Sequence, residues 1–206
     1  DTLWLSGDER WRETMPAALA QARAEGNIAR EWRIANNLIS ALQSYGPLAE
    51  GLALADEMAH KYDGLRLAGI RRNFEFRRIN LLLNLADYRA VRDGAPALLD
   101  APGLAAVMVV DLHCNLAEAE LETGHLDAAV ARLTSDPVTS TERGRVEAHR
   151  ILAEAHLDAL RPDLAAEQLA AFDTYDVGSL FHTLIAPTRA WIARALDEPA
   201  PPRPEE

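Results

Sequence analysis

The sequence predicts an all-α fold, a right-handed αα-superhelix in which antiparallel helix pairs stack as a solenoid. Three observations support this prediction. Hydrophobic residues make up 49% of the 206 residues, and Ala, Leu, Glu and Arg, which lose little side-chain freedom in a helix, dominate the composition. The chain matches itself at a fixed offset, which indicates stacked units. Single glycines and prolines separate helix-like segments and mark their ends.

The internal repeat is clearest between residues 116–133 and 152–169. These segments read LAEAELETGHLDAAVARL and LAEAHLDALRPDLAAEQL, and His113 and His149 extend the match upstream. Each segment holds a helical run, a short break and a second helical run, so each unit is an αα-hairpin. Small Ala129 and Ala165 fall where the second helix would pack against the first, because a larger side chain there would force the helices apart.

Glycine and proline residues at helix ends predict the helices along the whole chain. Expected breaks are Gly26, Gly46-Pro47, Asp63-Gly64, Pro102-Gly103, Asp136-Pro137 and Gly178. We expect helices at 8–24, 28–45, 48–61, 66–86, 88–97, 104–123, 126–134, 140–160, 163–172 and 178–196. They form one repeat domain over residues 1–196, with units at about 27–62, 66–100, 104–136 and 140–173, capping helices at 8–24 and 178–196, and a Pro-rich extended tail at 197–206.

Unit 116–133 also carries a family-like pattern: Leu116-Ala117, Gly124, Leu126, Ala129 and Leu133. This pattern resembles the tetratricopeptide (TPR) family. Weaker copies occur at Leu38, Leu42, Gly46, Leu48 and Gly51, and at Leu83, Ala86, Tyr88 and Val91. The next unit departs from it, since Leu160 stands in place of the turn glycine and Pro162 in place of an apolar residue.

The irregular spacing of the repeats is similar to that of the C-terminal repeat regions of large bacterial transcriptional regulators, of the maltose-regulator and antibiotic-regulatory-protein types. That resemblance implies a role in transcription regulation within a larger protein. The absence of an initial Met agrees with a segment of a longer chain.

The distribution of charge and the hydropathy of the chain argue against nucleic acids and membranes as partners. Residues 1–100 carry 13 Lys+Arg and 14 Asp+Glu, whereas residues 101–206 carry 8 and 18. An acidic half repels phosphate backbones, so we expect no direct contact with nucleic acid. Apolar runs are too short for a membrane span, and the single cysteine, Cys114, fits a reducing compartment. We therefore expect a cytoplasmic protein that does not bind membranes.

Candidate catalytic chemistry is weak. His113 and Cys114 are adjacent on one helix and point in different directions, and His149 and His156 lie about 10 Å apart, too far to share one zinc ion. Glycines are scattered singly, without a phosphate-binding loop. We expect no enzyme activity, no metal and no cofactor.

A polar strip on the first helix of each unit is the candidate binding site. In a stacked array these helices line the concave wall, where a ligand would bind. The strip comprises Arg33, Asn36, Asn37, Ser40 and Gln43, then Asn73, Arg77, Asn80 and Asn84, with Glu118 and Glu154 further on. Asn offers a donor and an acceptor to a peptide backbone, and Arg can bind a carboxylate. The alternative is that these residues form an ordinary solvated face.

The sequence therefore favours a non-catalytic domain that binds a protein or peptide, or acts as a sensor. The resemblance implies the same use of the concave face, because TPR relatives that bind peptide C-termini use Asn and basic residues there. Two alternatives stay open. The chain could be a scaffold or oligomerisation module whose end helices pair with another copy, or a helical enzyme with an unrecognised site.

Overall fold

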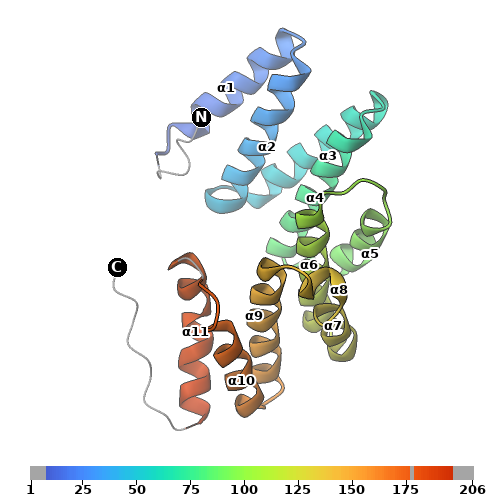
Figure 1. The fold of residues 1–206 in the computed structure, drawn as a ribbon. Helices are drawn as coiled ribbons and strands as arrows, with labels where there is room; N and C mark the ends of the chain where they lie inside the picture. The colour runs from blue at the N-terminus through green and yellow to red at the C-terminus, as the bar shows by residue number, and fades with distance from the viewer. Residues whose placement is uncertain (1–7, 177–178, 197–206) are drawn as a thin grey trace. The chain divides into compact units, whose positions relative to one another are not determined.

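The computed structural model describes residues 8–176 and 179–196, and in these residues all regular structure is helical (Figure 1). The chain divides into two compact units, Asp1–Ala105 and Ala106–Glu206, which we call the N-terminal and C-terminal units. The N-terminal unit contains α1 (Trp11–Ala24), α2 (Ile28–Tyr45), α3 (Leu48–Gly64), α4 (Ala68–Asn84) and α5 (Tyr88–Leu99). The C-terminal unit contains α6 (Ala106–Glu122), α7 (Leu126–Leu133), α8 (Asp136–Thr139), α9 (Glu142–Asp158), α10 (Pro162–Phe172) and α11 (Ser179–Ala195).

The all-α prediction is confirmed, and each of the ten expected helices has a counterpart. Helix α8 is an addition to the expected set, because Asp136-Pro137 predicts only a break. Pro137 lies in the first turn of α8, where no backbone N–H is required. Gly178 and the tail at 197–206 lie outside the described residues, and the single domain over 1–196 stays a prediction. No helix in the described ranges combines the length and apolarity that a membrane crossing requires.

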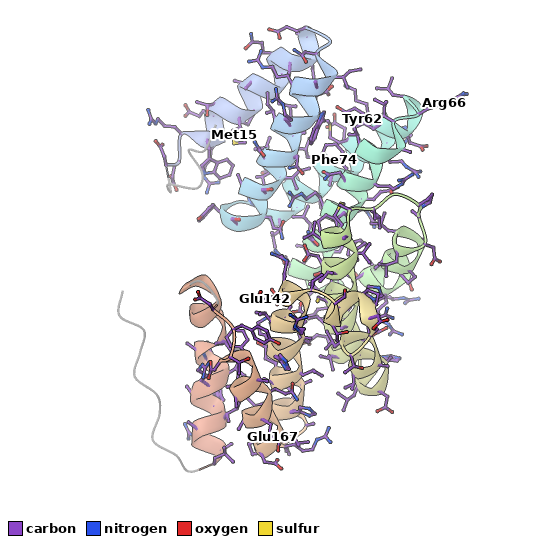
Figure 2. The ribbon with its side chains drawn as sticks, in the orientation of Figure 1. Met15, Tyr62, Arg66, Phe74, Glu142 and Glu167 are labelled. Atoms are coloured by element: carbon purple, nitrogen blue, oxygen red, sulfur yellow. The ribbon has the colours of Figure 1, made fainter. Side chains whose placement is uncertain are left out.

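In the described part of the chain, five helix pairs are joined by the same turn. The second residue after the first helix has a positive φ, and the next helix begins two residues later; these residues are Gly26, Arg66, Ala86, Gly124 and Leu160. Their N–H groups donate to the carbonyl three residues back, and the following N–H donates five residues back. This is the Schellman arrangement, which satisfies carbonyls that a helix end leaves unpaired. Figure 2 labels Arg66 at the turn between α3 and α4.

Within each unit, both consecutive and alternate helices pack against each other. In the N-terminal unit α2 contacts α4 as well as α3, and in the C-terminal unit α9 contacts α6 and α11 as well as α10. Such contacts between helices that are not consecutive in the chain place α2 beside α4, and α6 beside α9 beside α11. Side chains on these neighbouring helices can therefore form continuous faces.

The N-terminal core is built around aromatic and aliphatic side chains from α1 to α4. Tyr62 and Phe74 are fully buried and stack with ring centroids 5.7 Å apart (Figure 2). Met15 of α1 is buried in the same cluster. Beside them the buried carboxylate of Glu31 accepts hydrogen bonds from Lys61 Nζ at 2.6 and 2.7 Å and from Arg23 Nε at 3.2 Å. These bonds compensate the cost of removing the Glu31 charge from water.

The C-terminal core confirms the expected small residues at the hairpin crossings. Ala129 and Ala165 have no exposed surface, and each belongs to a core cluster of the unit. Val138 of α8 is also fully buried, so this short helix contributes to the core. A Cβ on Gly144 would overlap the carbonyl oxygen of Val138, hence only glycine allows α9 to approach the end of α8 this closely.

Candidate binding faces

The predicted strip of the N-terminal unit lies on two helices that contact each other. Nε of Arg77 on α4 donates to Oδ1 of Asn36 on α2 over 2.8 Å. Oγ of Ser40 donates to the carbonyl oxygen of Asn36 one turn earlier in α2. The structure thus brings Arg77 to Asn36, which lies 41 residues earlier in the sequence, and Ser40 follows Asn36 by one helical turn.

The α4 members of the strip differ in exposure. Asn73 is half-buried, and its Oδ1 atom is buried without a hydrogen-bond partner in the described part of the chain. Arg77 and Asn80 are half-buried, whereas Asn84 at the end of the helix is exposed. Asn36, Ser40, Asn73, Arg77, Asn80 and Asn84 form a surface that we call the α2–α4 face. It combines an oriented guanidinium with amide donors and acceptors.

Two further predicted residues, Arg33 and Asn37, line a separate pocket between α1 and α2. The pocket has a volume of about 360 Å³ and is lined by Met15, Ala18, Arg30, Arg33, Ile34 and Asn37. Arg33 is exposed, and its Nε donates to the carbonyl oxygen of Ala29 in its own helix. The predicted strip is therefore divided between this α1–α2 pocket and the α2–α4 face.

Glu118 and Glu154, the predicted residues of the C-terminal unit, both bind Arg150. The Arg150 guanidinium pairs with Glu118 on α6 and bonds to Glu154 at 3.1 Å and Glu147 at 2.8 Å on its own helix. One guanidinium thus faces three carboxylates, and the Arg150 side chain is only 18% exposed. Glu118 and Glu154 are thus engaged within the protein, and their role as ligand contacts stays a prediction.

Burial shifts the pKa values of Glu154 and Cys114, which lie at or near the Arg150 cluster. Burial raises the pKa of Glu154, the Arg150 charge opposes this shift, and Glu118 adds to it. Burial also raises the pKa of the Cys114 thiol to about 12, aided by the carboxylates of Glu147 and Asp111. A protonated thiol is a poor nucleophile at neutral pH. Cys114 is therefore a core residue, as its burial indicates.

Two of the histidines that the sequence offers as metal ligands, His113 and His149, have side-chain partners, whereas Nδ1 of His156 is buried without a hydrogen-bond partner in the described residues. Nδ1 of His113 lies 3.4 Å from Nη1 of Arg132, and burial lowers the pKa of His113. Nδ1 of His149 lies 2.9 Å from Oε1 of Gln168. Among the residues that the structure describes, His, Cys, Asp and Glu side chains do not gather in a group able to hold a metal ion.

Sequence reasoning missed Arg150, Glu147 and the contribution of α1. The spacing of Glu147, Arg150 and Glu154 is a recognisable signal, since residues three and four apart share a helix face. The contact between Arg150 and Glu118 on another helix carries no such signal. Met15 and Ala18 are predicted only to lie within a capping helix, yet they form one wall of the α1–α2 pocket.

Comparisons with protein-family models, with curated proteins and with solved structures found no match to this chain.

Proposed function

We propose that the chain is a non-catalytic helical-repeat domain that binds an extended peptide segment of a partner protein on the α2–α4 face. The observation that carries the proposal is the 2.8 Å hydrogen bond from Arg77 to Asn36. It joins two neighbouring helices at the middle of a polar surface and fixes the orientation of a half-buried guanidinium. A preorganised side chain loses less conformational entropy when a ligand binds.

The amides of this face suit a peptide backbone. An extended peptide presents N–H and C=O groups along its length, and an Asn side chain can pair with either. Asn80 is half-buried, so its amide borders the surface on which such a backbone would lie. Asn84 is exposed and extends the amide row to the end of α4.

The charge of α4 favours an acidic ligand. This helix contains Arg71, Arg72, Arg77 and Arg78 but only one acidic residue, Glu75, in a chain whose net charge is −11. Part of this positive charge is neutralised within the protein, because Arg71 pairs with Asp63 and Glu75. Arg78 likewise pairs with Asp56 on α3. Arg77 is held in place by the amide of Asn36 and lies among the Asn side chains of the face. It is the anchor for a Glu or Asp side chain of the partner.

We further propose that the helix pairs continue as a TPR-like superhelix within a cytoplasmic multidomain bacterial regulator. Five identical turns and the contacts between alternate helices support a repeat. In such a regulator the peptide would belong to a partner that controls activity.

A peptide array on the full chain tests the proposal. Fluorescence anisotropy would measure the binding of acidic peptides of about ten residues. Neutral and basic versions of the same peptides, and scrambled forms, would be measured for comparison. Loss of a charged hydrogen bond typically costs about 1.5–3 kcal/mol, so Arg77→Ala should weaken capture of acidic peptides roughly ten- to a hundredfold. The control is Arg89→Ala, which removes an arginine that is 92% exposed on α5. Equal binding by both variants would contradict the proposal.

A scaffold function is the second candidate, favoured by one observation on α11. Trp191 is 60% exposed, and Trp is among the residue types enriched at protein interfaces. If α11 pairs with a second copy, Trp191→Glu should convert a dimer to a monomer in analytical ultracentrifugation. A wild-type chain that stays monomeric at all accessible concentrations would rule this candidate out.

A further inference from the structure

The α1–α2 pocket has the composition of a small-molecule site. Its volume of about 360 Å³ falls in the range of small ligand pockets, about 300–1,000 Å³. Met15 and Ala18 of α1, with Ile34 of α2, supply apolar lining, and Arg30, Arg33 and Asn37 supply polar groups. An apolar surface with a few convergent polar groups is the usual makeup of a ligand pocket.

The electrostatics of the pocket favour an anion. The six lining residues in the described part of the chain include two arginines and no acid. Arg30 is partly neutralised, because its Nη1 lies 3.1 Å from Glu25 Oε2. Arg33 instead donates from Nε to the backbone oxygen of Ala29, and no carboxylate in the described residues pairs with it. Arg30 lies in the first turn of α2, where the helix dipole also favours negative charge.

We propose that this pocket binds an aliphatic monocarboxylate, with the carboxylate at Arg33 and Asn37 and the chain against Met15, Ala18 and Ile34. Arg33 and Asn37 are one helical turn apart and therefore share a face of α2. Arg33 can donate two parallel bonds to a carboxylate, and the amide of Asn37 can donate another. Ala18 and Ile34 are partly exposed and offer apolar surface to an alkyl chain, while Met15 is buried behind them in the core.

This site is distinct from the α2–α4 face, and it can bind an anion whether or not that face binds a peptide. Ligands in the pocket would contact α1, whereas Asn36 and Arg77 join α2 to α4. A monocarboxylate bound between α1 and α2 would hold these two helices together. The chain would then respond to a small metabolite anion by stabilisation of its first helix pair.

The test is an NMR titration of the ¹⁵N-labelled full chain with hexanoate, hexanamide and hexylammonium. Hexanoate should produce saturable shifts at the amides of Ala18, Ile34 and Asn37. Its affinity should exceed that of the neutral and cationic analogues by about tenfold, which is the value of one charged contact at a partly exposed site. Equal shifts with hexanamide, or hexanoate shifts spread over both units without saturation, would overturn the proposal.

Two variants with opposite chemistry locate the site. Arg33→Gln removes the charge from an exposed side chain and should weaken hexanoate binding about tenfold, whereas Arg89→Gln on α5 should have no effect. Ala18→Phe fills the pocket but keeps Arg33, and it should abolish binding. Undiminished binding in both Arg33→Gln and Ala18→Phe contradicts the proposal. Both variants should still bind acidic peptides through Arg77. A failure of the monocarboxylate proposal can therefore be distinguished from a failure of the peptide-binding proposal.

Discussion

His149 on α9 contacts Gln168 on α10, with Nδ1 and Oε1 2.9 Å apart. The same contact occurs at the equivalent positions of the preceding hairpin, where His113 on α6 meets Arg132 on α7. Both pairs are separated by 19 residues along the chain. The two hairpins of the C-terminal unit therefore share side-chain contacts as well as sequence, and the register derived from Leu116 and Leu152 is physically meaningful.

Residues at the shared turns should respond to substitution according to backbone conformation. Leu160 has a φ of 56° and is 88% exposed, so it has backbone strain and little packing. A non-glycine residue in this region costs roughly 1 kcal/mol, and Leu160→Gly should raise the free energy of unfolding by about 0.5–1 kcal/mol. Gly124→Leu should lower it by a similar amount, although open space surrounds Gly124. Urea denaturation followed by circular dichroism measures both, and the same sign for the two changes would contradict the shared turn.

Small residues at the hairpin crossings should not tolerate enlargement. Ala129 is fully buried between α7 and its neighbours, so Ala129→Leu should lower the free energy of unfolding by about 1–3 kcal/mol through overpacking. Ala131→Leu, at an exposed position of the same helix, should stay within about 0.5 kcal/mol of wild type. Denaturant melts that give equal values for the two variants would show that the hairpin register is wrong.

Helix positions and crossing residues could be predicted because both depend on local sequence. Glycine, proline and helical spacing locate ten of the eleven helices in the described part of the chain, and they place Ala129 and Ala165 correctly. The positive φ of the turn residues Arg66 and Ala86 could not be predicted, because residues other than glycine rarely adopt a positive φ and nothing in the sequence marks them. Helix α8 could not be predicted, because a proline such as Pro137 is as typical of a helix start as of a break between helices.

Contacts between helices were the unpredictable part of the candidate site. The sequence places Asn36 and Arg77 on one surface, but the rotation of α2 that turns Arg33 toward α1 and Asn36 toward α4 depends on the packing of three helices. Glu118 and Glu154 are predicted to meet a ligand. The structure pairs them with Arg150, whose partner on α6 lies 32 residues away in sequence.

The raised pKa of Glu154 predicts a specific pH dependence. Between the ordinary value of 4.5 and the raised pKa, the folded state binds more protons at this site than the unfolded state. The free energy of unfolding therefore falls as the pH rises through this window. Glu154→Gln removes this dependence and should gain stability relative to wild type between pH 4.5 and pH 7. Urea melts at pH 4.5 and pH 7 measure this gain in the free energy of unfolding. The control is Glu122→Gln, which changes an exposed carboxylate. A gain that becomes smaller as the pH rises would contradict burial as the cause of the raised pKa.

Cys114 should report unfolding of the C-terminal unit, because it is the only cysteine in the chain and is buried on α6. Its pKa of about 12 leaves a thiolate fraction on the order of 10⁻⁴ at pH 8, whereas an exposed cysteine with a pKa of about 8.5 is roughly one-quarter thiolate. Native protein should thus react with Ellman's reagent at least about a hundredfold more slowly than protein in concentrated urea. The control is the double variant Cys114→Ala, Ala131→Cys, whose thiol lies at an exposed position and should react rapidly without urea.

The same labelling decides whether the two units unfold together. Circular dichroism follows helices of both units, while Cys114 reactivity follows only the C-terminal unit. If the repeat continues through the chain as one cooperative array, the two urea midpoints should coincide, because neighbouring repeats stabilise each other. Midpoints that differ by more than the error of the melts would show two independently unfolding units. The prediction of one domain over residues 1–196 would then be wrong, while the hairpin register within each unit would still stand.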